Sequence, residues 1–483
     1  MPPAHRRVRP SPAGFPPAAP VRAATPGVIA KPARAAARRP ALITAFTRGH
    51  GAELTLLGIL IAKASIGFDE GRLPVLPLGI NLELPDALLV GALVYIGLRW
   101  ALTPKARLIR TPVDVPLLAF TGVTLFATLV AIVRSAVSIY DAIDATRTFS
   151  YYLSFFAVTN LITERRQLEF LLKGIFVIAT LVALAMVGQY VVGDAVHFLQ
   201  SSATDDITFG ATVRIDPPGF SLVLVGLVTT GCMLICEKFR PAMLLRFLQC
   251  GLLGMAFVLT YFRSYWTAVI LVLPLGAYLV RGEDRRRMTG WLSLVLVPTT
   301  LLVLIVVTVP DLPLSRLLKG SWDRLSTVGS SGTFTGSDPN YDYRRIENDY
   351  AVAAIREHPI LGRGLGASFR PLDPRLDWRD EKGLHDLTNH LHNAHLGVMV
   401  QSGVLGYACL VWLSVVVLRR GLSGWRTVPN DRLRAVVLGF ALVYLTLLIA
   451  AGANSLFVLS YWTPVIGIIL GVNEAILRKV RPA

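Results

Sequence analysis

The sequence predicts an all-α integral membrane protein with about twelve transmembrane helices and one large extracytoplasmic helical loop. Three observations lead to this prediction. Of the 483 residues, 53% are hydrophobic and only 16% are charged, and the mean hydropathy is +0.55. Apolar stretches recur at the length of roughly 20 residues that crosses a bilayer. Positive charge collects in alternate connections between them, as in the cytoplasmic loops of membrane proteins. This composition argues against a soluble enzyme and against a mainly disordered chain.

The first region, residues 1–50, differs from the rest of the chain. Ten of the 30 prolines lie in the first 40 residues, mixed with Ala and Arg, and no acidic residue precedes Glu53. Such a composition predicts a disordered, basic cytoplasmic tail. The arginine pairs at 6–7 and 38–39 resemble parts of an export signal, but only a short apolar stretch follows them. A cleavable signal is therefore not expected.

The candidate spans follow this tail. Each is apolar and close to the length needed for crossing, and they lie near 52–68, 84–98, 113–133, 148–162, 168–193, 218–236, 247–262, 264–280, 288–309, 392–418, 435–452 and 455–477. Residues 51–309 thus hold spans one to nine and 392–477 hold spans ten to twelve. An extracytoplasmic loop domain, 310–391, lies between them, and residues 478–483 form a short cytoplasmic tail.

The charge distribution predicts the orientation. With the N-terminus in the cytoplasm, the inner connections carry 30 Lys and Arg residues against five acids. The outer connections carry 16 basic residues, of which 11 lie in 310–391 beside 12 acids. Long segments translocate largely regardless of their charge. Both termini are therefore expected in the cytoplasm. The net charge of +17 belongs mainly to that face, so it does not predict a nucleic-acid partner.

The long outer segment contains a helical pattern. Apolar residues recur at helical spacing between Tyr343 and Ile360, as at Ile346, Tyr350 and Ile355. A loop of this length inside a compact protein is usually functional. We therefore expect an outward helix packed over the bundle.

Arg263 is the first candidate functional residue. It is the only charge between Arg246 and Arg281, and it separates two spans with almost no loop. The predicted topology places it at the outer membrane edge, where a charged side chain is expensive and often functional. The alternative is an arginine that only orients a tight hairpin.

Arg214 is the second candidate, because it is the only Lys or Arg in the outward connection 194–217. Two arginines at the outer face would suit a pyrophosphate, since guanidinium offers paired donors and keeps its charge when buried. The alternative is an ion pair with a nearby acid: Asp205, Asp206 or Asp216.

Four of the eight histidines crowd into eleven residues before the tenth span: His385, His390, His392 and His395. One interpretation is a metal site built from His392 and His395 with His390 or His385, although no Cys or Glu joins them. A second is a single catalytic base, because imidazole titrates near neutral pH. A third is that histidines suit a membrane interface.

The run His392-Asn393, nine residues, Gly403-Val-Leu-Gly406 resembles the C-terminal signature of the O-antigen ligase and polymerase superfamily. Three other pieces are similar to the same family. They are Arg345 followed by His358-Pro359-Ile-Leu-Gly362-Arg-Gly364, the stretch Tyr261-Phe-Arg-Ser264, and Arg214 before a proline-rich turn. The sequence departs from the family's common residues at Phe262, Ser264 and Gln401.

The resemblance implies a GT-C-like membrane glycosyltransferase of the bacterial inner membrane. Such an enzyme takes a glycan from an undecaprenyl-pyrophosphate carrier on the extracytoplasmic face. A ligase transfers it to a lipid-A core sugar, and a polymerase transfers it to another carrier-linked glycan. The expected partners are the carrier-linked glycan, a glycan or lipid acceptor, and the bilayer, with no metal and no cofactor.

The resemblance also implies residue roles. Arg214 and Arg263 would bind the pyrophosphate leaving group, and His392 would be the general base, giving inversion. Asn393 would orient His392 or the acceptor, and Arg345 would contact substrate. Gly403 and Gly406 would let the tenth helix pack closely on a neighbour.

A transporter or flippase is the alternative from another class, because twelve spans with both ends inside is also a common transporter plan. A secondary transporter usually shows two similar halves and broken midplane helices, and the sequence shows neither. The large outer loop favours an enzyme. The choice between ligase and polymerase stays open.

Overall fold

The computed structural model describes residues 49–63, 76–77, 81–104, 106–192, 201–203, 213–294, 339–380, 383–385 and 388–480. The chain separates into two compact units, Met1–Thr44 and Ala45–Ala483. The first unit, which contains most of the predicted basic tail, lies outside the described residues. The helices and strands of the described residues belong to the second unit.

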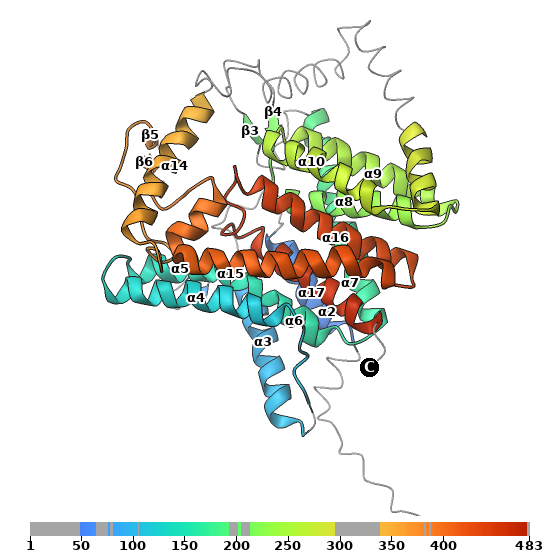
Figure 1. The fold of residues 1–483 in the computed structure, drawn as a ribbon, viewed down its shortest axis with the longest axis horizontal. Helices are drawn as coiled ribbons and strands as arrows, with labels where there is room; N and C mark the ends of the chain where they lie inside the picture. The colour runs from blue at the N-terminus through green and yellow to red at the C-terminus, as the bar shows by residue number, and fades with distance from the viewer. Residues whose placement is uncertain are drawn as a thin grey trace, which may run out of the picture. The chain divides into compact units, whose positions relative to one another are not determined.

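The described residues are mainly helical, which confirms the all-α prediction (Figure 1). The helices are α2 (Gly51–Lys63), α3 (Leu84–Leu102), α4 (Asp114–Val133), α5 (Ile139–Ser150), α6 (Ser154–Leu161), α7 (Arg165–Val192), α8 (Phe220–Cys236), α9 (Ala242–Leu259), α10 (Arg263–Leu279), α14 (Pro339–Glu357), α15 (Ala394–Gly424), α16 (Asp431–Ala450) and α17 (Thr463–Val480). Three short antiparallel ribbons accompany them: β1 (Leu76–Pro77) with β2 (Asn81–Leu82), β3 (Ser201–Ala203) with β4 (Val213–Ile215), and β5 (Trp378–Asp380) with β6 (Gly383–His385).

Six helices among the described residues are long and apolar enough to cross a membrane: α3, α4, α7, α9, α15 and α16. Each has at least 18 residues, and a helix of that length rises about 27 Å, close to the hydrocarbon thickness of a bilayer. These helices point to a multi-pass membrane protein. The count of twelve spans stays a prediction, because most of the predicted ninth span, 288–309, lies outside the described residues.

Two predicted spans differ from the observed helices. The predicted span 148–162 belongs to a longer helical run that begins with α5 at Ile139, tightens into a 3₁₀ turn at Tyr151–Leu153 and ends with α6. The polar first part of this run has no membrane-like hydropathy, so a hydropathy pattern misses it. The twelfth predicted span, 455–477, becomes a helix only at Thr463. The turns before Thr463 contribute to the candidate site.

The helices pack as neighbours that are distant in sequence (Figure 1). Helix α16 packs on α8 and α10, α15 packs on α4, α17 packs on α6, and α14 lies against α15. A cluster of aromatic rings joins the N-terminal ends of α8 and α10 to the start of α17. The ring of Phe220 lies 5.8 Å from Phe262, 4.9 Å from Tyr265 and 6.2 Å from Trp462. Aromatic pairs at these distances stabilise beyond their buried area, so the cluster fixes these three ends together.

Candidate active site

The helix predicted between Tyr343 and Ile360 forms, and so does the tight turn before Arg263. Helix α14 covers most of the stretch 343–360, and α9 is joined to α10 by only three residues. The middle one, Tyr261, has a φ of +50°, a conformation that costs a non-glycine residue on the order of 1 kcal/mol or more. The turn therefore holds Arg263 at the first position of α10.

Asn393 fixes the start of α15. Its side-chain oxygen accepts hydrogen bonds from the backbone N–H groups of His395, at 3.1 Å, and Leu396, at 3.2 Å. This is the usual N-cap arrangement, in which a short polar side chain satisfies the first free amides of a helix. The cap places His392 directly before the helix. The prediction that Asn393 contacts substrate is not tested by this arrangement and stays a prediction.

His392 is hydrogen-bonded to a buried carboxylate. Its Nδ1 lies 2.9 Å from Oε2 and 3.2 Å from Oε1 of Glu347, and its backbone N–H lies 3.4 Å from Oε2. The Glu347 side chain is 1% exposed, whereas that of His392 is 34% exposed. An ionised carboxylate only accepts hydrogen bonds. A neutral imidazole in this arrangement carries its proton on Nδ1, which leaves Nε2 as the acceptor of the ring.

The sequence prediction missed Glu347. Its signal was an acidic residue on the apolar face of the outer helix, one turn after Tyr343 and one turn before Tyr350. The pairing itself joins residues 45 positions apart, which no local pattern reports. The Tyr343 ring also packs edge-on against the His392 ring, at 5.7 Å. Burial and the charge of Glu347 raise the pKa of Tyr343 to about 12, so this phenol stays protonated.

The loop that follows α14 holds this helix in place. Tyr350 donates a hydrogen bond to Asp373 at 3.0 Å, and the adjoining apolar cluster contains Ala351, Ala354 and Phe369. Hydrogen bonds from Arg375 keep the pKa of Asp373 well below its usual range. Asp373 therefore remains an acceptor for Tyr350 at neutral pH.

The other histidines have different partners. The His395 Nε2–H donates to the backbone carbonyl of Leu448 at 2.8 Å, so this ring is used within the bundle. The ring of His390 lies 5.1 Å from that of His392, and its Nε2 lies 3.4 Å from the Ser455 hydroxyl. Burial and the neighbouring His392 lower the pKa of His390. The side chain of His385 lies outside the described residues.

The metal interpretation finds no support in these positions. Among the described residues, no three His, Cys, Asp or Glu side chains are grouped closely enough to hold a metal ion. His392 and His395 are only three positions apart, but their rings have different hydrogen-bond partners. The His392 ring bonds to Glu347, and the His395 ring bonds to the carbonyl of Leu448. A metal-independent reaction stays a prediction.

The connection between α16 and α17 contacts the residue after Arg263 and a histidine two positions before His392. Ser455 contacts His390, and the adjacent Asn454 donates to the Ser264 hydroxyl at 2.7 Å. Ser264 follows Arg263, which is half-buried. The structure therefore brings the predicted base and one predicted leaving-group arginine to the same end of the bundle.

The structure describes the backbone of Arg214, which precedes α8. It lies in β4 opposite Ser202 of β3, six positions before Phe220 at the start of α8. The Phe220 ring packs on Phe262, the residue before Arg263. The side chain of Arg214 lies outside the described residues, so its role stays a prediction.

Arg345 does not join the Glu347–His392 pair. It is exposed on α14 and lies two positions before Glu347, and residues two apart do not share a helix face. Its predicted contact with substrate stays a prediction.

The signature glycines form a joint between two backbones. Gly403 has a φ of +65° inside α15, and a Cβ there would lie 2.0 Å from the carbonyl oxygen of Ile360. The amide of Val404 donates to the carbonyl of Pro359 at 2.8 Å, and the amide of Arg363 donates to that of Val400 at 2.7 Å. Gly403 therefore opens one turn of α15 to receive the segment after α14. Close packing was expected, but the neighbour is this segment.

The remaining glycines fill related roles. A Cβ at Gly362 would lie 2.5 Å from the carbonyl oxygen of Val400, from the other side of the same joint. A Cβ at Gly406 would lie 1.9 Å from the hydroxyl of Ser402, one turn earlier in α15, and 3.9 Å from Thr124 of α4. Gly406 therefore makes room mainly for a side chain of its own helix. Gly362, Gly364 and Gly366 all have positive φ, a conformation that glycine adopts readily.

Comparison with known protein families finds a match over the part of the chain that contains most of this site. Residues 248–411 match the family model described as O-antigen ligase. The matched stretch contains Arg263, Glu347, His392 and both signature glycines. No curated protein matches the chain. Over residues 248–411, the chain is therefore similar to the O-antigen ligase family.

Proposed function

We propose that the chain is an inner-membrane glycosyltransferase that moves a glycan from an undecaprenyl-pyrophosphate carrier to an acceptor hydroxyl on the extracytoplasmic face. The similarity to the O-antigen ligase family over residues 248–411 supports this class of reaction. Both termini would lie in the cytoplasm, as the distribution of Lys and Arg predicts. The reaction would use no metal and no cofactor.

One observation carries the proposal, the hydrogen bond between half-exposed His392 and buried Glu347. A base that takes a proton from a sugar hydroxyl needs a free ring nitrogen facing the substrate and a partner that fixes the other nitrogen. Nε2 of His392 would be the base. Glu347 would stabilise the imidazolium that forms after proton transfer.

The remaining steps use the arginines. The acceptor hydroxyl loses its proton to Nε2 of His392, and its oxygen attacks the anomeric carbon. The bond from that carbon to the carrier pyrophosphate breaks, and the pyrophosphate leaves with the electron pair. Arg263 and Arg214 would stabilise its charge, and attack opposite the leaving group inverts the anomeric centre. Positioned charges in a site of low dielectric constant are effective in this role.

This pair of residues favours an enzyme over a flippase or transporter, because moving a lipid-linked glycan across the bilayer requires no general base. A ligase and a polymerase would share every step and differ only in the acceptor. We propose the ligase reaction, with repeat-unit polymerisation as the alternative.

The test measures glycan transfer in membranes that contain single variants. His392→Ala should lower transfer by about 10²–10⁴-fold, the usual loss for a missing general base. His395→Ala is the matched control, since that ring contacts a carbonyl of the bundle, and it should retain transfer better. Arg263→Lys should insert normally yet lose most activity, because it keeps the charge but not the planar fork. Full transfer by His392→Ala would contradict the proposal.

A further inference from the structure

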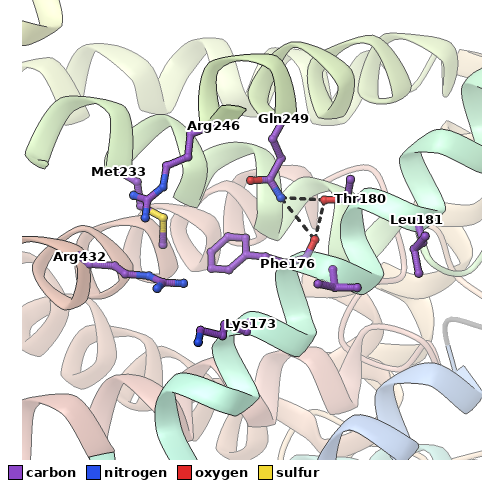
Figure 2. A pocket seen from close by; sticks show the side chains of 9 residues that line it. Lys173, Phe176, Thr180, Leu181, Met233, Arg246, Gln249 and Arg432 are labelled. Carbon is purple, nitrogen blue, oxygen red and sulfur yellow. Dashed lines mark hydrogen bonds between the residues drawn. The ribbon is translucent and has the colours of Figure 1, made fainter. Parts of the chain in front are cut away.

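A pocket lies between α7, α8, α9 and the start of α16, away from the candidate active site (Figure 2). Its volume is about 390 Å³, within the range of about 300–1,000 Å³ that small-molecule sites occupy. The part of α16 that lines it is the first turn, at Arg432, whereas the connection near His392 follows the other end, at Ala450. Eighteen helical residues separate these ends by about 27 Å.

Three cations surround one side of this pocket. Figure 2 shows the side chains of Lys173, Arg246 and Arg432 around the same space. Arg432 is the second residue of α16, where the helix dipole adds partial positive charge. Lys173 and Arg246 lie beyond the first turns of α7 and α9. A negatively charged group placed among them would be stabilised by all three side chains.

The pairing of these cations is incomplete. Arg246 forms an ion pair with Glu237. Lys173 and Arg432 make no ion pair within the described part of the chain, and the Nε of Arg432 is buried there without a hydrogen-bond partner. The carboxylates that act on Arg432 at longer range are Glu237 and Glu169, and Glu169 pairs with Arg165.

The other side of the pocket is apolar and opens outward. Phe176 and Met233 line it, and so do Val177 and Leu181, which are 56% and 55% exposed. These exposed apolar side chains lie on α7, a helix long and apolar enough to cross a membrane. The pocket therefore combines a cationic end with an apolar wall that faces the lipid side.

The pocket also has a fixed polar boundary. The Gln249 side-chain amide donates to the Thr180 hydroxyl at 2.7 Å and to the carbonyl of Phe176 at 3.5 Å, joining α9 to α7 (Figure 2). These bonds hold α7 and α9 at a fixed separation. The three cations lie on one side of this contact.

We propose that this pocket binds an anionic phospholipid, with the phosphate of its headgroup among Lys173, Arg246 and Arg432 and an acyl chain along Val177 and Leu181. Guanidinium and ammonium groups are the usual partners of phosphate. A free phosphate ion would use the cations but gain nothing from the apolar wall.

The experiment uses the full chain purified in a non-ionic maltoside detergent. Native mass spectrometry would measure binding of dioleoyl-phosphatidylglycerol, of phosphatidylcholine with the same acyl chains, and of inorganic phosphate. We expect phosphatidylglycerol to bind at least about tenfold more tightly than the other two. Equal affinity for phosphatidylcholine, or inorganic phosphate binding as tightly as phosphatidylglycerol, would overturn the proposal.

Variants locate the binding. Arg432→Gln and Lys173→Gln should each weaken phosphatidylglycerol binding about fivefold, the loss expected for one cation near an anionic headgroup. Arg419→Gln is the matched control, because Arg419 is exposed on α15 outside the pocket. Lys173 is itself exposed, so its variant tests the site even if Arg432→Gln fails to fold. Val177→Trp keeps every charge and should also weaken binding, by obstructing the apolar wall. Identical binding by all four variants would overturn the proposal.

Discussion

At the scale of single residues, one carboxylate determines which nitrogen of His392 is free to take a proton. Glu347 is buried and lies 2.9 Å from Nδ1. Glu347→Gln keeps the size of the side chain but removes the charge that stabilises the imidazolium. Glycan transfer in membranes should fall by about 100-fold or more, and its pH profile should shift.

The control for this prediction is on the same helix. Glu357 is exposed and pairs with Arg363, so Glu357→Gln should retain transfer. The role assigned to Glu347 is wrong if both variants transfer glycan equally well.

The second residue-scale prediction concerns acid stability. Burial and His392 lower the pKa of His390 below its ordinary value of 6.5. The unfolded chain therefore takes up a proton at this residue at a higher pH than the folded chain does. Stability should decrease as the pH falls below about 6.5. The measurement is the thermal unfolding temperature at pH 7.5 and 5.5, and His390→Gln should show a smaller decrease. An unchanged decrease in that variant would show that His390 is not responsible.

At the scale of elements, the joint between α15 and the segment after α14 should depend on Gly403. An Ala there would have to adopt a φ of +65° and place its Cβ 2.0 Å from the Ile360 carbonyl oxygen. The cost is about 3 kcal/mol or more, so Gly403→Ala should lower the melting temperature and disable transfer.

Gly397 provides the comparison within α15. A Cβ at Gly397 would meet only Leu391, at 4.0 Å. Gly397→Ala should therefore melt like the natural chain. Equal melting temperatures for the two variants would argue against a structural role for the joint.

Some of these elements could be predicted from the sequence, and others could not. Helical spacing predicted α14, and an isolated charge between two apolar stretches predicted the turn before Arg263. Both are local patterns. The opening of α15 at Gly403 was not predictable, because helical periodicity continues across it and the partner segment lies about 40 positions earlier. Glu347 was missed for the same reason, since its significance depends on a contact between distant segments.

At the scale of the whole molecule, the predicted orientation can be tested directly. Asp349 is exposed on α14, and Glu283 is exposed after α10. In intact cells, a membrane-impermeant thiol reagent should label Asp349→Cys but not Glu283→Cys, because the positive-inside rule places them on opposite faces. The natural chain controls for Cys232, Cys236, Cys250 and Cys409. Labelling of Glu283→Cys in intact cells would contradict the topology.

The connection between α16 and α17 has a consequence for how the chain tolerates changes in length. It is bonded at Ala451 to the amide of Ala394, at 2.8 Å, at Asn454 to Ser264, and at Ser455 to His390. These anchors lie within five positions of one another and link the segment that carries His392 to the segment that carries Arg263. Inserting or deleting a single residue here would shift at least one anchor and change how the segments of His392 and Arg263 lie relative to each other. We therefore expect this connection to tolerate substitutions better than insertions or deletions.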